Sequence, residues 1–502
     1  FTVNWLKGIA HKNKPIHAFT QKTQKTSKKI LELGNANAAI IHAKESLKKG
    51  LNVWIATDSM QQARKANLFL NCPNVLDKEN AEEIMMELLA DGDITENQVL
   101  LVHSENKGDA KQAAFLANPN EESKKYRLVI HTPVISSGIS VTHTHFDRVY
   151  ALFCNVLAPN EMLQTIARVR TAKEIFVSFK SNHAKDRPTN IQDLIEGHHI
   201  KLGRFNPEKF ITEYDDFDKL RLEHIATRNA ALNDYKRYFI LLAQLKGYDF
   251  EQHDLTRWTI SGLGAAAREQ KINQIYIASD IDAQEAAAID LKSSPTQQET
   301  DSLHRYKVTQ MTGKEHGKID ESDINFYLNN GLSKISNYEL IHADINDLKD
   351  SDHANQKTRD KLSSKTSKHY LFKTVIDGLT NKRLNARGAR SVCQFLKAHH
   401  KELASNNMGN YAKVSKYPIK QLNQFFDKIG YGLINDSTSH NGEQWYRIQV
   451  NPLVQYYAEN RMRAKQEKLN NDKALNWEEA TFCLNKTVSS SQTVSIEYGS
   501  EN

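Results

Sequence analysis

Between residues 128 and 170, the order of hydrophobic and polar positions predicts a strand, a turn, a second strand and a helix. Residues 128–130 form a short apolar run rich in β-branched side chains, and small and hydroxylated residues follow at once. Such a run is typical of a buried parallel strand that ends at the edge of a sheet. Residues 146–153 alternate as a second strand, and Pro159 with Asn160 opens a helix. These elements predict an open α/β sheet, in which ligands bind at the strand ends.

The turn after the first of these strands carries groups that can hold phosphate. Thr132, Ser136, Ser137 and Ser140 supply hydroxyls, and Gly138 allows a close backbone approach or a positive φ. Hydroxyls and backbone N–H groups bind phosphate oxygens without reading bases. The alternative is an ordinary turn, the commoner reason for a Ser/Thr cluster.

The predicted helix that follows places an amide and a guanidinium together. Gln164 and Arg168 are four residues apart and would share one helix face. Arginine is suited to stabilising the charge on a transferring γ-phosphoryl group. Taken alone, an arginine on a helix is more often solvated or ion-paired than functional.

At this point the sequence resembles a known family. TPVISSGISV, residues 132–141, resembles motif V of superfamily 2 helicases, and QTIARVR, residues 164–170, resembles their motif VI. The form is that of the herpesvirus-type origin-binding proteins and the related plasmid replication proteins of the cyanobacterial RepA type. Upstream, residues 50–67 and 99–116 resemble the strand–helix pairs that open the second RecA-like lobe. The resemblance covers roughly residues 30 to 185.

The resemblance implies roles for individual residues. It implies that nucleic acid lies along the strand ends, on Thr57, Ser59, His103, Ser104, Thr132 and Ser136. It also implies that ATP bound by another lobe is faced by Gly138, Ser140, Gln164, Arg168 and Arg170, with Arg168 or Arg170 as the arginine finger and Gln164 beside them. Ser140 replaces the usual motif V acidic residue and Ala167 the usual motif VI glycine, and the two arginines are closer together than in the commonest pattern.

The sequence contains no G-x-x-x-x-G-K-[ST] loop, which would cradle phosphates and Mg²⁺. GKEHG at 313 and GLGAAAR at 262 lack the required ending, and the acidic residues 320–323 are more typical of a helix start than of a Walker B box. With Phe1 as first residue, we expect a C-terminal fragment that lacks the first RecA-like lobe, the lobe that would hold ATP and Mg²⁺. A site shared by two lobes cannot turn over ATP with one of them, so the chain alone should hydrolyse none.

The positive charge is concentrated in one segment. The net charge is +7, yet residues 357–428 alone carry 16 Lys or Arg against four carboxylates. Helical patterns over residues 388–405 and 415–430 precede two short strands around a polar loop, which outlines a winged helix. The expected DNA contacts are Lys413, Lys416, Lys420, Gln421 and Gln424. The alternative is a small packing or partner-docking module.

The predicted architecture is therefore an α/β, RecA-like parallel-sheet helicase lobe (1–195), an α-helical connector (196–350), a winged-helix domain (368–452) and a mobile tail (453–502). The connector would brace the motor or clamp DNA, and residues 348–367 read as a linker. Single-stranded DNA would cross the lobe and duplex would bind the winged helix.

Composition adds limits on compartment and metal content. Four dispersed cysteines without a C-x-x-C pair favour a reducing, cytoplasmic compartment. No apolar run approaches the roughly 18 residues of a membrane span. The histidines at 131, 143, 145, 198 and 199 lack the acidic or cysteine companions of a metal site, so we expect no bound metal.

Three functions remain open from the sequence. The first is a replicative or origin-associated helicase, and the second is a non-enzymatic initiator or regulator that uses the motor lobe as a scaffold. The third is a restriction or mobilisation ATPase, which would need a nuclease or relaxase domain that the sequence does not show.

Overall fold

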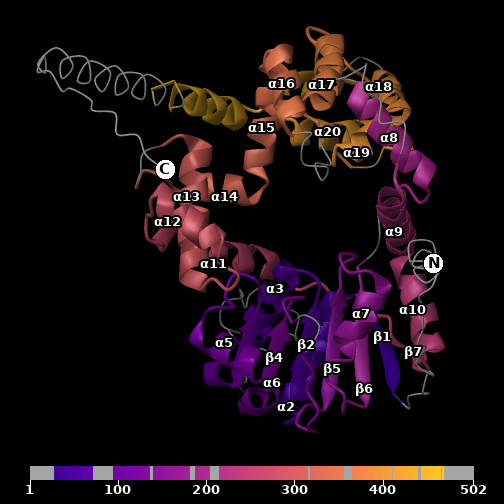
Figure 1. The fold of residues 1–502 in the computed structure, drawn as a ribbon, viewed down its shortest axis with the longest axis vertical. Helices are drawn as coiled ribbons and strands as arrows, with labels where there is room; N and C mark the ends of the chain where they lie inside the picture. The colour runs from indigo at the N-terminus through magenta and orange to yellow at the C-terminus, as the bar shows by residue number, and fades with distance from the viewer. Residues whose placement is uncertain are drawn as a thin grey trace, which may run out of the picture.

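The structure is a computed structural model that describes residues 28–71, 94–135, 139–180, 187–203, 214–314, 317–355, 364–409, 411–438, 443–464 and 466–467. A parallel sheet of seven strands forms its largest part (Figure 1). The strands, in the spatial order β3-β4-β2-β5-β6-β1-β7, are β1 (Lys29–Leu33), β2 (Val53–Thr57), β3 (Val99–Val102), β4 (Leu128–His131), β5 (Arg148–Phe153), β6 (Glu174–Phe179) and β7 (Asp249–Asp254). The predicted α/β sheet is confirmed.

Helices cover both faces of the sheet because side chains alternate along each buried strand. One face packs against α2 (Ala36–Lys48), α3 (Met60–Asn71) and α11 (Leu263–Ile277). The other packs against α5 (Ala110–Ala117), α7 (Pro159–Ile166) and α10 (Tyr235–Leu245). Within β5, Tyr150 and Leu152 enter the first core, whereas Val149 and Phe153 enter the second.

The lobe extends past residue 195, where the sequence suggested that it ends. β7 pairs in parallel with β1 at the edge of the sheet, and α10 packs on the second core. The sequence of β7, DFEQHD, is polar and almost wholly exposed, because an edge strand needs little apolar surface. Its polar pattern explains why the strand was missed. The expected all-helical connector thus begins after β7.

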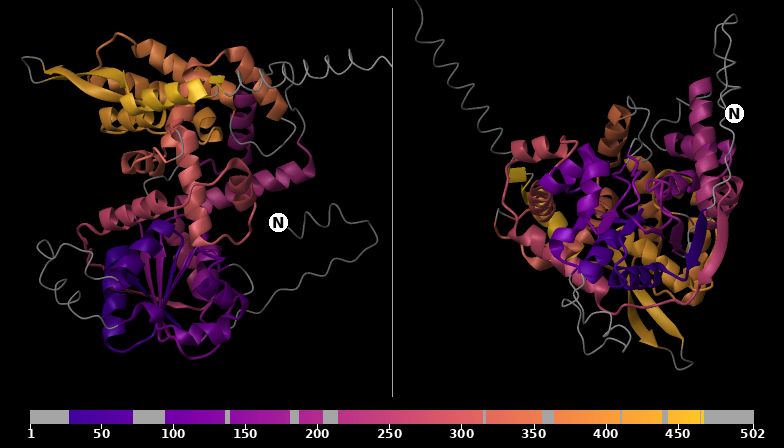
Figure 2. Two further views of the ribbon diagram at one scale, coloured as in Figure 1. Left: turned by 90° about the vertical axis from the view of Figure 1, so that its left-hand side faces the viewer. Right: turned by 90° about the horizontal axis from the view of Figure 1, so that it is seen from below.

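A helical region stands between the lobe and the C-terminal residues (Figure 2). Besides α11 it contains α12 (Ala283–Asp290), α13 (Gln297–Thr312), α14 (Glu321–Leu328), α15 (Gly331–His342) and α16 (Ile345–Asn355). The Asp320 carboxylate accepts a hydrogen bond from the Asp323 N–H and caps α14, so the helix-start interpretation of the acidic run is confirmed. A second connection is made by α8 (Ile191–Gly203) and α9 (Asp216–Asn233): on α8, Asp193 and Glu196 both pair with Lys401.

The C-terminal unit, which we define as residues 364–450, is built from helices and one hairpin. Its elements are α17 (Lys365–Leu379), α18 (Ala386–Ala398), α19 (His400–Ser405), α20 (Pro418–Lys428), β8 (Tyr431–Thr438) and β9 (Gln444–Val450). Phe372, Leu396, Phe425 and Phe426 form its core. Leu384 also pairs with Tyr446, which adds a short third strand segment to the hairpin.

Two segments are more ordered than the sequence suggested. Part of the expected linker is helical, since α16 reaches Asn355, and the buried Asp352 carboxylate accepts hydrogen bonds from the Ser364 hydroxyl and the Thr366 N–H at the start of α17. The expected mobile tail begins with a helix over residues 452–464, whose Val454 and Tyr457 are buried. The apolar side chains on one face of that helix were overlooked among its charges. The residues after 467 lie outside the described part of the chain.

Candidate nucleotide and nucleic acid site

The two segments that suggested a phosphate site lie side by side. Val141 and Val169 form a parallel bridge, in which the Val141 N–H donates to the Arg168 carbonyl at 2.8 Å and the Arg170 N–H to the Val141 carbonyl at 2.9 Å. The loop after β4 and the loop before β6 therefore run together as a short two-stranded pair. This pairing places Ser140 next to both arginines.

The side chains of this pair form a cationic cluster. Arg170 Nε donates to the Ser140 hydroxyl at 2.7 Å, and Arg168 Nη1 donates to the Ile139 carbonyl at 3.1 Å. Arg168 Nε is buried without an acceptor. Lys28 Nζ donates to the Arg170 carbonyl at 2.6 Å. In the part of the chain that the structure describes, no carboxylate forms an ion pair with either arginine.

The pKa shifts in this cluster are those expected for neighbouring cations. Burial, and then the charge of Arg170, lower the pKa of the Arg168 guanidinium. The same two causes, in the same order, lower the pKa of Lys28. A bound anion would relieve both effects, because an opposite charge nearby favours the protonated form.

Gln164 does not share a helix face with Arg168, as the sequence suggested. α7 ends at Ile166, with Ala167 as its C-cap, and Arg168 lies beyond it because its backbone pairs with Val141. Gln164 is exposed on the last turn of α7. It remains a candidate by position, one helical turn from the cluster.

Most of the candidates at the carboxyl ends of the strands are buried. Thr57 is 1% exposed and its hydroxyl donates to the Leu152 carbonyl at 2.8 Å, and Thr132 is 5% exposed. His103 is 2% exposed and its Nδ1 accepts from the Glu105 N–H. Ser59 caps α3 through its hydroxyl, which accepts from the Gln62 N–H. These groups already serve the fold.

Three of the proposed residues lie outside the described part of the chain, and a fourth has an exposed side chain. Ser136, Ser137 and Gly138 lie outside the described residues. Ser104 is exposed beside His103 at the end of β3. Of the carboxyl-edge candidates that the structure describes, Ser104 is therefore the one whose hydroxyl most readily meets a ligand.

Asp58, which the sequence analysis missed, holds the loop between β5 and α7 in place. Its buried carboxylate accepts hydrogen bonds from the backbone N–H groups of Cys154 at 2.6 Å, Val156 at 2.8 Å and Leu157 at 3.2 Å. Burial raises the pKa of this carboxyl, although these three donors act in the opposite direction. The signal was an acidic residue directly after the apolar run of β2. Asp58 fixes the loop that leads into α7.

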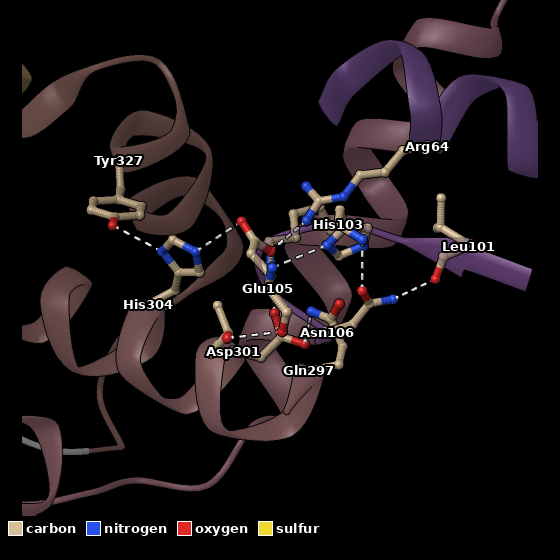
Figure 3. Close-up of polar contacts among 11 residues, drawn as sticks. Arg64, Leu101, His103, Glu105, Asn106, Gln297, Asp301, His304 and Tyr327 are labelled. Carbon is tan, nitrogen blue, oxygen red and sulfur yellow. Dashed lines mark hydrogen bonds and ion pairs between the residues drawn. The ribbon is translucent and has the colours of Figure 1, made fainter. Parts of the chain in front are cut away.

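A buried ionic network joins the carboxyl edge of the sheet to the helical region (Figure 3). Glu105, after β3, pairs with Arg64 of α3 at 2.5 Å, Lys271 of α11 at 2.7 Å and His304 of α13 at 3.3 Å. Lys271 also pairs with Asp301 at 2.6 Å. Three helices from two regions thus converge on one carboxylate.

The charges in this network determine its protonation states. Burial alone would raise the pKa of Glu105, but the hydrogen bond from His304 and the charges of Lys271 and Arg64 hold it well below its usual range. Burial, and then the Arg64 charge, lower the pKa of His103 to about 4. The network is therefore an ionised Glu105 next to a neutral His103.

The expected DNA contacts of the C-terminal unit mostly lie on its surface. Lys413, Lys416, Lys420 and Gln424 are exposed, and Lys416 Nζ lies 5.0 Å from the ring centroid of Tyr417. Gln421 is different, because its amide bridges the Ser415 N–H and the Lys413 carbonyl at 2.8 and 2.9 Å. It shapes the loop before α20.

The described residues show neither a metal cluster nor a membrane-spanning helix. No cluster of three or more His, Cys, Asp or Glu side chains there could hold a metal ion. None of the helices described is both long and apolar enough to cross a membrane.

No protein family and no curated protein matches this chain. Among solved structures, it is similar to "Mss116p DEAD-box helicase domain 2 bound to an RNA duplex", with 11% identity over 44% of this chain and 86% of that one and a TM-score of 0.22. It is also similar to UvsW of T4, with 12% identity over 46% of this chain and 42% of that one and a TM-score of 0.23. At TM-scores this low, the α/β architecture rests on the strand order and register alone.

Proposed function

We propose that this chain is the C-terminal part of an ATP-dependent DNA helicase or origin-binding replication protein, of the superfamily 2 type found in herpesvirus-type and RepA-type replication proteins. The α/β lobe supplies Arg168, Arg170 and Gln164 to a nucleotide held by a second RecA-like lobe. Single-stranded DNA crosses the α/β lobe, and the C-terminal unit binds duplex.

The observation that carries this proposal is the pairing of residues 139–141 with residues 168–170. It leaves Arg168 Nε buried without an acceptor and both arginines without a carboxylate among the described residues. A buried donor without a partner costs about 1–3 kcal/mol, so such a cluster is best explained by an anion that completes it. Arginines serve this role for phosphoryl groups.

The cluster fits the phosphates of ATP but not its metal ion. ATP would bring the phosphoryl group whose developing charge the arginines stabilise. Mg²⁺ in phosphate sites is usually held by one or two carboxylates besides the phosphates, and the described residues form no cluster of His, Cys, Asp or Glu that could hold a metal ion. Together with the missing G-x-x-x-x-G-K-[ST] loop, this is why we assign Mg²⁺ and most of the nucleotide contacts to the other lobe.

The C-terminal unit supports the DNA-binding half of the proposal. Helix α17, the short segment at Leu384, helices α18 and α20, and the β8–β9 hairpin follow one another in the order of a winged helix. α20 would be the recognition helix. Its exposed lysines would give a salt-dependent, phosphate-based affinity.

The test compares the chain alone with the chain joined to a lobe that carries a Walker loop. Alone, it should bind DNA and hydrolyse no ATP. With the second lobe, DNA-stimulated hydrolysis should appear, and replacement of the arginine finger by alanine should lower kcat about 1,000-fold. Arg168→Ala and Arg170→Ala are compared, with exposed Lys173→Ala as the control. ATPase activity from the chain alone, or full activity in both arginine variants, would overturn the proposal.

A second candidate is a non-enzymatic initiator or regulator that uses the lobe as a scaffold. It is favoured by the burial of Thr57, His103 and Thr132, which leaves few open polar groups at the carboxyl edge of the sheet. In that case duplex binding persists, and no DNA-stimulated ATPase appears with any second lobe.

A further inference from the structure

A polar cavity of about 810 Å³ lies between the helical region and the C-terminal unit. Its walls come from α15, from α17, from residues 406–408 and Tyr411, and from one side of α20. On α20, Gln421, Gln424 and Lys428 are three and four residues apart, so they line one helix face. The volume lies within the roughly 300–1,000 Å³ typical of small-molecule sites.

The charged groups of this cavity are three lysines and one carboxylate. Lys334 uses the Asp427 carboxylate in an ion pair of 2.6 Å. Lys428 Nζ donates to the Met408 carbonyl at 2.7 Å and lies 5.6 Å from the centroid of the Tyr411 ring. Lys368 lines the cavity and, within the described ranges, forms no hydrogen bond or ion pair. The cavity therefore holds more positive charge than its own residues neutralise.

Lys368 is partly buried, whereas the Lys428 side chain is exposed and its ammonium group lies against Met408 and Tyr411. Burial lowers the pKa of Lys368 and of Lys428, and the acidic residues nearby, Asp352 and Asp427 respectively, compensate only in part. Asp352 is already engaged by Ser364, Lys365 and Thr366. An anion entering the cavity would meet two ammonium groups with unused donor capacity.

The turn that brings the Met408 carbonyl to the Lys428 ammonium group depends on glycine. Gly409 has φ of 98°, and a Cβ there would lie 2.8 Å from Lys428 Nζ. The left-handed conformation carries the chain past Met408, whose carbonyl holds the ammonium group. Asn407 precedes it with φ of 58°, a conformation that asparagine tolerates, and its side chain is exposed at the cavity.

We propose that this cavity binds a nucleotide through its phosphate, either as the phosphorylated end of a strand held on α20 or as a free nucleotide. Lys368 and Lys428 bind the phosphate, because ammonium groups form strong charge-assisted hydrogen bonds with phosphate oxygens. The amides of Asn407 and Gln424 offer both donors and acceptors to a base edge.

The position of the cavity connects it to the proposed duplex surface. Gln424 lies one helical turn after Lys420, so the exposed face of α20 leads from the surface lysines into the cavity. The strand-end form of this inference rests on the proposed DNA binding, whereas the free-nucleotide form does not. The two forms share one phosphate site and differ in what carries the phosphate.

The experiment uses the full chain and two kinds of probe. Fluorescent duplexes that carry a 5′-phosphate, a 3′-phosphate or neither are compared by anisotropy, and adenosine 5′-monophosphate is titrated calorimetrically. A terminal phosphate should tighten duplex binding by about tenfold if it gains a charge-assisted hydrogen bond. Lys368→Met should abolish that preference and the binding of the free nucleotide, and Lys368→Arg should restore both in part.

The controls separate the cavity from the duplex surface and from folding. Lys420→Met should weaken all duplexes to a similar extent and leave the phosphate preference unchanged. Asn407→Asp places a negative charge at the cavity with a side chain of the same shape, and it should remove the preference even if Lys368→Met does not fold.

The outcomes distinguish this inference from the proposed function. Nucleotide binding that depends on Lys368, without any duplex binding, supports the cavity and overturns the DNA-binding proposal. Duplex binding without phosphate preference, together with no binding of the mononucleotide, overturns the cavity. A preference that survives both Lys368→Met and Asn407→Asp overturns it as well.

Discussion

The polar side chains at the two candidate binding sites differ in exposure between the α/β lobe and the C-terminal unit. In the lobe, Thr57, Asp58 and His131 are buried and hydrogen-bonded to the surrounding chain. In the C-terminal unit, Lys416 and Lys420 point to solvent around an apolar core. A residue type that suggests chemistry therefore serves the architecture in the first region and is open to a partner in the second. The cluster of Arg168 and Arg170 is the place where the lobe departs from this rule.

The largest effect is expected when the exposed positive charges of the C-terminal unit are reversed. Changing Lys413, Lys416 and Lys420 to Glu removes three cations and adds three repulsive groups. Binding of duplex DNA should weaken by at least about 1,000-fold near physiological salt, and the dependence of affinity on salt should become shallower. Fluorescence anisotropy over a range of salt concentrations measures both quantities.

A matched variant tests whether position or net charge is responsible. Lys49, Lys111 and Lys246 are exposed on the lobe, and their replacement by Glu changes the net charge by the same amount. This control should keep most of the affinity. Equal losses in the two triple variants would mean that α20 and the loop before it have no special part in binding.

The buried network around Glu105 gives the largest expected effect on the contact between the lobe and the helical region. Lys271 is 3% exposed and pairs with both Glu105 and Asp301. Lys271→Met leaves the buried Asp301 and the partly buried Glu105 short of a partner, which should cost about 3 kcal/mol. Hydrogen exchange should accelerate in α11 and α13, with little change in β2 and β5.

An exposed ion pair provides the contrast for that variant. Lys307 of α13 pairs with Asp290 of α12 at 2.8 Å, and both side chains are largely in solvent. Lys307→Met should leave the exchange of α11 and α13 unchanged, because solvent screens such pairs. Equal acceleration of hydrogen exchange in Lys271→Met and Lys307→Met would show that burial does not strengthen the Glu105 network.

The sequence was sufficient to predict most of the lobe but not its polar sites. β4, β5 and the start of α7 follow directly from apolar runs and from Pro159, and all three are observed. β7 could not be found, because an exposed edge strand carries no apolar pattern. The pairing of Val141 with Val169 was equally hidden, since no local pattern shows which loops will meet.

The candidate site shows the same limit at the level of single residues. Residue types correctly indicate where hydroxyls and imidazoles lie, yet they do not show that Thr57 and His103 are buried. Near His103, residues of α11 and α13, which are distant in sequence, contact this edge of the sheet, and the Thr57 hydroxyl is bound to Leu152 of β5. Asp58 gave a local signal, an acidic residue at a strand end, but its three backbone partners belong to a loop almost 100 residues away.

The buried imidazoles give a smaller test of whether polar side chains of the lobe are shielded from solvent. Burial lowers the pKa of His131 to about 4 from 6.5, and His103 is similarly lowered. Between these pH values the unfolded chain binds protons that the folded chain does not, so the free energy of unfolding should decrease as the pH falls from 6.5 to 4. Each imidazole should contribute on the order of 2 kcal/mol over this window. Urea denaturation at several pH values measures this slope, and His131→Gln should reduce it. The substitution should also lower stability at neutral pH, because it removes the acceptor of the hydrogen bond from Trp54 Nε1 to His131 Nε2, which is 2.9 Å long. An unchanged slope in His131→Gln would show that this imidazole is accessible to protons in the folded lobe, contrary to the contrast between the two regions.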